Sequence, residues 1–308
     1  MALDNTGTRV WLVTGTSSGL GLALVKAILA AGERVIATLR DPEQLRDLKA
    51  DHSPKQLLVH RLDVTKIAEI SAVFDAARTH FGRLDVVVNN AGYGILAEIE
   101  ATPDEAARHN FEVQFWGPVN ITREAIKFMR NVNPAGHGGL IINVSSAGGY
   151  LANPALAFYN ASKFALEGFT QAFVREMLPE WNIRGLIVEP GGFQSEWVNG
   201  SMQTFPAPPE YGPTSPSGVV RTHLEPTNSN FLGVPEKMAA AIMRAADEKN
   251  LPLRLPLGSE SWAIVRGQAQ KTLREADEWE EVSHSTNRDG IDGPQAAKEI
   301  MEKLQSLF

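Results

Sequence analysis

The sequence has no cysteine among its 308 residues. This absence excludes disulfide bonds, thiolate catalysis and cysteine-ligated metal sites, and it fits a reducing compartment. Histidine occurs seven times, but no HExxH or comparable cluster is present. We therefore expect no metal site.

Long apolar runs and a surplus of basic residues are also missing. No apolar stretch approaches the roughly 20 residues that a bilayer span needs. The opening residues, MALDNTGTRVWLVTG, lack the basic segment and apolar run of a signal peptide. The net charge of −7 gives no electrostatic reason to expect a nucleic acid or an anionic membrane as partner. We expect a soluble, cytoplasmic protein.

The first 190 residues contain a regular alternation of short β-branched runs and longer helical patterns. The runs are nearly all apolar, which is typical of strands buried on both faces of a parallel sheet. The alternation predicts right-handed βαβ units and an α/β fold, a doubly wound parallel sheet in three αβα layers. The expected strands are residues 9–14, 34–39, 56–62, 84–89, 139–144 and 183–188, and the expected helices lie near 19–31, 66–81, 103–131 and 156–179.

The composition then changes, because residues 190–235 are dense in proline, glycine and serine. This segment is too long for an ordinary connection and is either a functional lid or a disordered linker. A helix at about 235–248, a charged helical stretch at 260–281 and a polar tail follow it. We expect one domain over residues 1–258 with a lid at about 194–233. Residues 259–308 are expected to form a helical C-terminal extension that is not an independent domain.

The stretch VTGTSSGLG, residues 13–21, follows the first expected strand and opens the first expected helix. Gly15 allows a tight turn, while Gly19 and Gly21 let the backbone and the helix approach a pyrophosphate and the sheet. The helix N-terminus supplies free N–H groups and a favourable dipole. Such spacing also fits a plain strand-to-helix turn, but after the first strand of a βαβ array it favours dinucleotide binding.

This stretch resembles the TGxxxGxG motif of the short-chain dehydrogenase/reductase family. NNAG (89–92), NVSS (143–146), YNASK (159–163) and PGG (190–192) follow in that family's order and approximate spacing. The resemblance covers about residues 9–258, and YNASKFALEG is similar to the ketosteroid-reducing, 17β-hydroxysteroid-dehydrogenase-like branch. It implies a Rossmann-like fold and a nicotinamide-dependent oxidoreductase.

The end of the second strand bears on which nicotinamide is bound. In a Rossmann unit an acidic residue there selects NAD, whereas an arginine accommodates the 2′-phosphate of NADP. The sequence VIATLRDP has no acid at the strand end, and Arg40 follows. Arg40, Thr16 and Ser17 as hydroxyl donors, and the resemblance to an NADP-preferring branch favour NADP(H); a solvated loop arginine is the alternative. Asp63 resembles the residue facing the adenine amino group, with Val64 beside it, although Asp63 could merely cap the next helix.

The resemblance implies further cofactor contacts. Asn90, Ala91 and Gly92 would line the central part of the cofactor. Pro190, Gly191, Phe193 and Ser195 would pass its nicotinamide end, with Ser195 where the family usually has threonine. The glycine-turn contacts would be Gly15, Thr16, Ser17, Ser18, Gly19 and Leu20.

A ketone–alcohol interconversion needs a proton donor, and tyrosine is a poor one because its reference pKa is about 10. Tyr159 and Lys163 are four residues apart, so on a helix they share a face, and a nearby cation lowers the pKa of a phenol. For a YxxxK pattern alone, an exposed helical pair is the alternative. The resemblance makes Tyr159 the general acid/base, Lys163 the residue that binds the ribose and tunes Tyr159, and Ser146 the residue that polarises the carbonyl. Ser145 is expected to face the other way and to pack or cap.

Gln114 in FEVQFWG, residues 111–117, has helical spacing with the apolar Phe111 and Ile121. A buried amide there needs hydrogen-bond partners or costs roughly 1–3 kcal/mol. The family motif usually has asparagine at this position, where it holds open a water route to the active-site lysine. Glutamine keeps the amide but is longer by one methylene. We therefore place Gln114 in the catalytic set, as the member that puts proton transfer in doubt.

The candidate pocket residues are Tyr93, Phe158, Phe193 and Trp197, below the lid. Aromatic residues beside the cofactor motifs indicate a bulky apolar substrate such as a polycyclic or prenylated ketone, although each ring could equally pack the core. The leading hypothesis is an NADPH-dependent enzyme that interconverts a ketone and a secondary alcohol on a hydrophobic small molecule.

Two other functions remain open. One is a non-redox cyclase or isomerase with structural NADP(H), suggested by Gln114 and the proline-rich lid. The other is a cofactor-sensing binding protein, against which the intact set of Ser146, Tyr159 and Lys163 argues. The resemblance also suggests a homodimer or homotetramer through the helices at 103–131 and 156–179.

Overall fold

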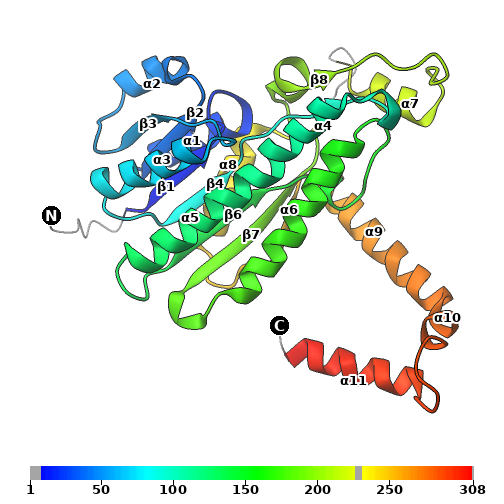
Figure 1. Ribbon diagram of the computed structural model, residues 1–308. Coiled ribbons are helices and arrows are strands. Elements are labelled where there is room, and N and C mark those ends of the chain that lie inside the picture. Colours follow the sequence, from blue (N-terminus) through cyan, green and yellow to red (C-terminus); the bar gives the residue numbers. More distant parts are fainter. Residues whose placement is uncertain (1–7, 226–230, 307–308) are drawn as a thin grey trace. The chain divides into compact units, whose positions relative to one another are not determined.

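The computed structural model describes residues 8–225 and 231–306 of the chain (Figure 1). The chain divides into two compact units, Met1–Trp262 and Ala263–Phe308. The division falls inside helix α9 (Ser259–Glu278). None of the helices in the described ranges combines the length and the apolar character that a membrane span requires.

A seven-stranded parallel sheet in the order β3-β2-β1-β4-β6-β7-β9 forms the centre of the first unit. All six strands expected from the sequence are present. The seventh, β9 (Arg254–Leu257), is a partly exposed edge strand that contains Pro256, and its sequence lacks the β-branched pattern that marks the others. The six expected strands are β1 (Val10–Thr14), β2 (Arg34–Leu39), β3 (Leu57–Arg61), β4 (Val86–Asn89), β6 (Gly139–Val144) and β7 (Ile183–Pro190).

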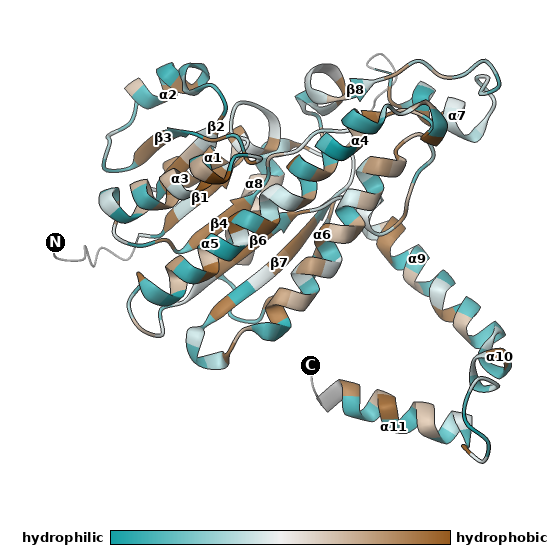
Figure 2. Ribbon diagram, in the orientation of Figure 1, coloured by the Kyte–Doolittle hydropathy of each residue, from teal (hydrophilic) through white to brown (hydrophobic). Residues whose placement is uncertain are grey.

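Alternate residues of the central strands face opposite layers of helices, because side chains of a strand alternate with a period of two. Trp11 and Val13 of β1 pack in one core cluster with α1 (Gly19–Ala30) and α8 (Pro235–Asp247). Their neighbours Val10 and Leu12 pack in a second cluster, on the other face of the sheet. The helices of that face are α3 (Ile67–His80), α5 (Gly117–Asn131) and α6 (Ala157–Glu176). Figure 2 shows the strands as an apolar layer between the helices of the two faces. The expected doubly wound, three-layer fold is confirmed.

The helix expected over 103–131 is interrupted. It consists of α4 (Asp104–Phe111), a π-helical turn (Glu112–Trp116) and α5. A π-helical turn holds an extra residue, so it changes which side chains share a face before and after it. Gln114 lies in this turn, and its position is therefore not the one that a regular helix would give it.

The described part of the lid is folded rather than a linker. Its strand β8 (Gln203–Thr204) pairs with β5 (Ile95–Leu96), which follows β4. Helix α7 (Pro216–His223) is attached to the same region through Arg221, which donates two hydrogen bonds to Glu98, at 2.9 and 2.6 Å. Residues 226–230 of the expected lid lie outside the described residues.

The second unit contains the rest of α9, α10 (Glu280–His284) and α11 (Gly293–Ser306). The helical expectation for 260–281 is correct. The polar segment after it contains α11, at whose start Asp292 accepts a hydrogen bond from the Gln295 N–H at 3.1 Å.

Candidate active site

The glycine turn packs closely against the loop after β4. Gly15 has a φ of +69°, and a Cβ at this position would lie 2.7 Å from Cα of Ala91. Both the backbone conformation and the close approach require glycine. Helix α1 begins at Gly19, where an added Cβ would lie 3.3 Å from Cβ of Ser195. The N-terminus of α1 and the beginning of the lid are therefore neighbours, as a shared cofactor site requires.

One expected phosphate contact is wrong. Thr16 is fully buried, and its hydroxyl donates to the Thr38 carbonyl at 3.1 Å. Thr16 therefore ties β1 to β2 and does not face a ligand. Ser17 and Ser18 are exposed at the start of α1, and Leu20 packs against the core.

Arg40 follows β2 with an exposed side chain, and Asp63 is partly buried nearby, after β3. Burial alone would raise the pKa of Asp63, but hydrogen bonds from Thr65 and the charges of Lys66 and Arg40 lower it overall. Asp63 Oδ1 accepts from the Thr65 N–H at 3.0 Å and from its hydroxyl at 2.8 Å. One carboxylate oxygen of Asp63 therefore organises the turn before α3.

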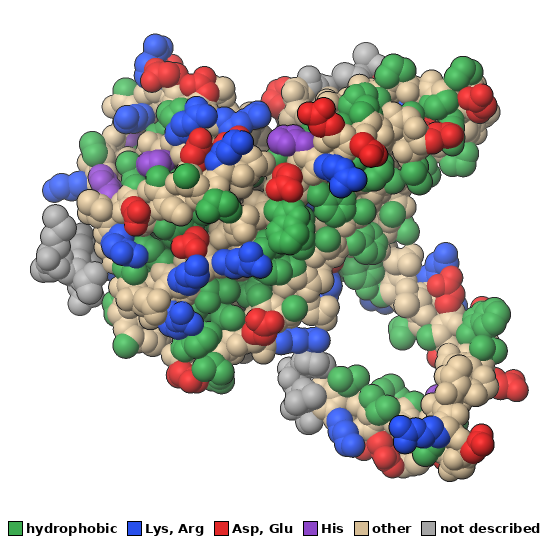
Figure 3. Space-filling view, in the orientation of Figure 1, with side chains coloured by type: hydrophobic (Ala, Val, Ile, Leu, Met, Phe, Trp, Pro, Cys, Tyr) green, Lys and Arg blue, Asp and Glu red, His purple; other side chains and the backbone are tan. Residues whose placement is uncertain are grey.

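Val64 is the second residue expected on the adenine side of the site. Val64 is buried, and it packs so tightly on α5 that a Cβ at Gly117 would lie 2.9 Å from Val64 Cγ2. Figure 3 shows Lys and Arg side chains near α1 and α2 (Arg46–Ala50), interspersed with Asp and Glu side chains.

The loop after β4 is fixed to the end of β1. The Asn90 side-chain amide donates to the carbonyls of Thr14 and Gly15, at 2.9 and 3.1 Å. The N–H groups of Asn90 and Ala91 donate to the Thr14 hydroxyl, both at 3.0 Å. The expected central cofactor contacts are therefore held beside the glycine turn, and Gly92 follows them with an exposed backbone.

The structure brings together Ser146, Tyr159 and Lys163. Tyr159 and Lys163 are buried on the same face of α6, with Lys163 Nζ 5.8 Å from the centroid of the Tyr159 ring. The Lys163 ammonium group donates to the Val144 carbonyl at 2.8 Å. Ser146 begins the turn after β6, accepts from the Gly148 N–H at 3.0 Å and is hydrogen-bonded to the Tyr159 phenol. The Ser146 hydroxyl would have to turn from Tyr159 to donate its proton to a substrate oxygen.

Burial has the largest effect on the pKa values in this group. Burial raises the pKa of the Tyr159 phenol above its usual value, and the hydrogen bond to Ser146 only partly opposes this effect. Burial also lowers the pKa of Lys163 to about 8, against the opposing charge of Glu167. Burial and Ser146 are the causes of the Tyr159 shift, so the lowering of the Tyr159 pKa by Lys163 that the sequence suggests stays a prediction.

Of the four expected pocket aromatics, Trp197 contacts the catalytic group. Its ring centroid lies 5.5 Å from that of Tyr159, and the rings are tilted by 55°. Phe193 is buried in the core, where a Cβ at Gly233 would lie 2.5 Å from its ring, so the packing alternative is favoured for Phe193. Tyr93 is partly buried beside His109, with ring centroids 6.3 Å apart. Phe158 is partly exposed on α6.

The segment after β7 is held by residues that the sequence patterns do not single out. The Gly191 N–H donates to the Leu257 carbonyl at 3.0 Å, and the Gly192 N–H donates to Glu260 at 2.8 Å. Ser195 accepts a long hydrogen bond, 3.4 Å, from the Trp197 N–H. The strand β9 and the start of α9 thus fix the Pro190–Gly191 segment from behind.

Gln114 is almost completely buried and contacts the loop after β4 rather than Lys163. Its amide nitrogen donates to the Tyr93 carbonyl at 2.5 Å, and Asn110 donates to the same carbonyl at 3.2 Å. Gln114 Oε1 has no hydrogen-bond partner in the described part of the chain, and a Cβ at Gly92 would lie 2.3 Å from it. The amide therefore lies under the expected cofactor loop, with one acceptor left over.

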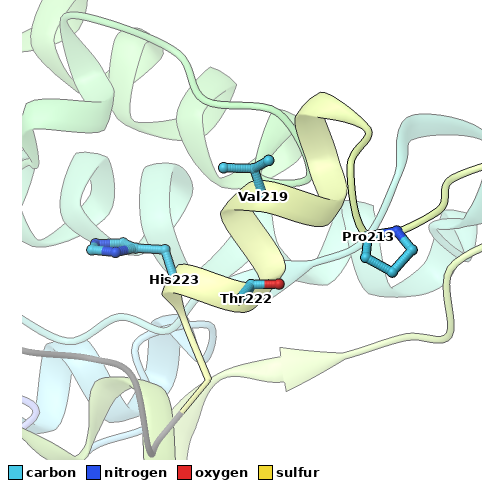
Figure 4. A pocket seen from close by; sticks show the side chains of 4 residues that line it. All are labelled: Pro213, Val219, Thr222 and His223. Atoms are coloured by element: carbon cyan, nitrogen blue, oxygen red, sulfur yellow. The ribbon is translucent and has the colours of Figure 1, made fainter.

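A hollow of about 390 Å³ lies on the lid (Figure 4). Its lining side chains belong to α7 and the loop before it. They are Pro213, Val219, Thr222 and His223, none of which is an expected site residue.

The residues present fit a nicotinamide dinucleotide. The glycine turn, the free N-terminus of α1, Arg40 after an acid-free strand end and the fixed loop after β4 all lie at the carboxyl ends of the strands. This edge is where ligands bind in open α/β sheets.

Comparison with known proteins agrees with this geometry. The sequence model described as short chain dehydrogenase matches residues 9–204. An uncharacterized oxidoreductase of Schizosaccharomyces pombe is 38% identical over 300 residues, which make up 96% of this chain and 97% of that protein. A 3-ketodihydrosphingosine reductase of Bacteroides thetaiotaomicron is 30% identical over 252 residues, 81% of this chain and 88% of that protein.

Solved structures share the fold. A short-chain dehydrogenase from Streptomyces avermitilis matches with a TM-score of 0.81 and 35% identity, over 92% of this chain and 100% of that one. Two structures from Burkholderia species that share the fold alone, at 23% and 20% identity, contain NADP and NAD respectively. This chain is therefore an oxidoreductase of the short-chain dehydrogenase/reductase family.

Proposed function

We propose that the protein is an NADPH-dependent carbonyl reductase that interconverts a ketone and a secondary alcohol on a hydrophobic small molecule. The observation that carries the proposal is the buried Tyr159, hydrogen-bonded to Ser146 and placed one helical turn before Lys163. A reduced nicotinamide bound along the glycine turn would supply the hydride. The protein's own residues then have to bind the carbonyl oxygen and give it a proton.

Tyr159 is the group with a proton to give. Its phenol is protonated at neutral pH, since burial raises a pKa that is ordinarily already about 10, and it would give that proton to the carbonyl oxygen as the hydride arrives. Ser146 would donate a hydrogen bond to the same oxygen, while its own oxygen accepts from the Gly148 N–H. Lys163 holds the end of β6 through the Val144 carbonyl and would bind the ribose.

The cofactor preference and the substrate class rest on separate features. The exposed Arg40 after a strand end without an acid favours the 2′-phosphate of NADPH. Trp197 on Tyr159 gives the site an apolar wall and favours a bulky apolar ketone. The similar 3-ketodihydrosphingosine reductase is named for a ketone of this kind. The expected homodimer or homotetramer stays a prediction.

The test is a panel of hydrophobic ketones with NADPH, followed at 340 nm, for the wild-type protein and for Tyr159→Phe. We expect oxidation of NADPH with at least one ketone. We also expect a loss of at least about 100-fold in kcat for the variant, with NADPH binding retained. Absence of oxidation across the panel, or full activity of Tyr159→Phe, would overturn the proposal. Turnover of a substrate without net NADPH oxidation would point to the non-redox alternative.

A further inference from the structure

Two buried carboxyl groups lie behind the catalytic residues. Glu167 is on α6, one helical turn after Lys163 and two turns after Tyr159, and Glu189 is next to the end of β7. The Glu167 side chain is 4% exposed and that of Glu189 is 0% exposed. Carboxylates are rarely buried so completely unless they are paired.

Few cations and donors serve this pair. Arg254 on β9 has its Nε 3.1 Å from Glu167 Oε2 and 3.5 Å from Glu189 Oε1, and the Tyr150 ring lies 6.0 Å from its guanidinium carbon. The Ser145 hydroxyl donates to Glu167 Oε1 at 2.6 Å. Within the described residues, neither Glu189 oxygen receives a hydrogen bond from an N–H or hydroxyl donor.

The two carboxyl groups differ in the donors that reach them. Two adjacent carboxylates in a buried site cannot both ionise at low cost, even with Arg254 beside them and the charge of Lys163 acting on Glu167. Glu167 accepts from Ser145 and Arg254, which favours its ionised form, whereas Glu189 is fully buried without a hydrogen-bond donor in the described part of the chain, which favours its protonated form. Burial and the Glu167 charge accordingly raise the pKa of Glu189 to about 8.

The pair is connected to both sides of the active site. Glu167 holds Ser145, which directly precedes Ser146, and Lys163 holds the Val144 carbonyl on the other side of Ser145. A Cβ at Gly149 would lie 2.4 Å from both Glu167 Oε1 and the Ser145 hydroxyl, so the turn after β6 closes directly over this contact. Glu189 directly precedes the Pro190–Gly191 segment, and its carbonyl accepts from Ser261 at 2.6 Å.

We propose that Glu167 and Glu189 share one proton and act as a buried positioning pair that sets the place of the Ser145–Ser146 turn relative to the Pro190–Gly191 segment. Glu167 acts through its hydrogen bond with Ser145. Glu189 carries the shared proton, which removes its own negative charge at the end of β7. The catalytic part of this inference rests on the proposed function, whereas the shared proton does not.

The shared proton is tested by urea unfolding between pH 5.5 and 7.5. In this range the folded protein keeps a proton that the unfolded chain releases, because the pKa of Glu189 rises from 4.5 to about 8 on folding. The unfolding equilibrium constant of the wild-type protein should therefore rise with pH, by up to about tenfold per pH unit. The lowered pKa of Lys163 acts only above this range.

Glu189→Gln keeps a neutral donor at the same place and should flatten this dependence. Glu176→Gln, which removes an exposed carboxylate at the end of α6, the helix that carries Glu167, is the control and should keep the wild-type slope. A wild-type slope in Glu189→Gln would overturn the shared proton.

The positioning role is tested by the kinetics of NADPH-dependent reduction at pH 7. Glu176→Gln should keep kcat within about twofold, whereas Glu167→Gln should lower kcat about tenfold with the KM for NADPH nearly unchanged. Ser145→Ala removes only the hydroxyl that Glu167 holds and should show the same split, so the test does not depend on the folding of Glu167→Gln. Wild-type kcat in Ser145→Ala and in any folded Glu167→Gln would overturn the positioning role. If the wild-type protein reduces no ketone, the proposed function fails, and the unfolding experiment still decides the shared proton.

Discussion

The Trp197 ring lies over the Tyr159 ring, with centroids 5.5 Å apart. This contact joins the lid to the catalytic helix, because Trp197 belongs to the π-helical turn at the start of the lid and Tyr159 to α6. The lid therefore contributes both to the apolar wall of the site and to the burial that raises the pKa of Tyr159.

Trp197→Ala should weaken both contributions. Loss of the aromatic contact, worth about 1 kcal/mol, should raise the KM for a bulky ketone roughly fivefold. Water admitted beside Tyr159 should lower its pKa, so the loss of reductase activity at high pH should begin at a lower pH. Trp197→Phe keeps a ring and serves as the control. An unchanged KM and pH profile in the alanine variant would contradict the role given to Trp197.

The Arg221–Glu98 ion pair should stabilise the protein through the lid. The hydrogen bonds from Arg221 outweigh the effect of burial and lower the pKa of Glu98 from 4.5 to about 2. A lowered pKa in the folded state contributes stability above pH 4.5, and this contribution is lost as the pH falls toward 2. Glu98→Gln should reduce the free energy of unfolding at pH 7 by about 1–3 kcal/mol and weaken the loss of stability at acid pH.

The neighbouring Glu100 provides a control for Glu98. It accepts a hydrogen bond from the Tyr211 hydroxyl at 2.7 Å on the exposed surface, so Glu100→Gln should change the unfolding free energy little. Equal effects of Glu98→Gln and Glu100→Gln in urea unfolding would argue against a specific anchor.

Arg40 should decide the cofactor preference. Arg40→Ala removes the cation expected to face the 2′-phosphate, so it should raise the KM for NADPH at least about tenfold and leave the KM for NADH nearly unchanged. Arg46→Ala, at an exposed arginine on α2 (Arg46–Ala50), removes the same charge away from the strand end. If both variants weaken NADPH equally, the preference comes from overall charge and Arg40 is a solvated loop residue.

The sequence predicts the fold well where a strand is buried on both faces. The β-branched runs of β2 and β6 give their bounds without error, because nearly all of their residues are buried and most of them are apolar. The edge strand β9 escapes prediction, since Pro256 and partial exposure remove that pattern. The helical extension over 259–308 is expected, but the start of α11 within it is not, because that start depends on the Asp292 cap rather than on an apolar run.

The candidate site shows the same division between pattern and packing. The spacing of Tyr159 and Lys163 predicts their shared face, and the structure places them there. Whether Thr16 faces a ligand or the Thr38 carbonyl depends on how β1 and β2 pair, which the spacing of residues does not encode. Glu167 lies inside the recognised motif YNASKFALEG and Glu189 directly precedes PGG, yet Arg254 contacts both carboxyl groups only because α6, β7 and β9 meet.

Substitutions of Gln114 test whether this residue affects proton transfer in the active site. Its amide nitrogen holds the Tyr93 carbonyl, while Oε1 has no partner in the described part of the chain. Gln114→Ala removes one of two donors to that carbonyl, and since Asn110 keeps the other, we expect a loss in kcat of only about three- to tenfold. Gln114→Asn restores the amide at a shorter reach and should keep or raise kcat. If Gln114 limits proton transfer, the solvent isotope effect on kcat should be smaller in Gln114→Asn than in the wild-type protein. If Gln114→Ala kept the wild-type kcat, Gln114 would have only a packing role in the π-helical turn.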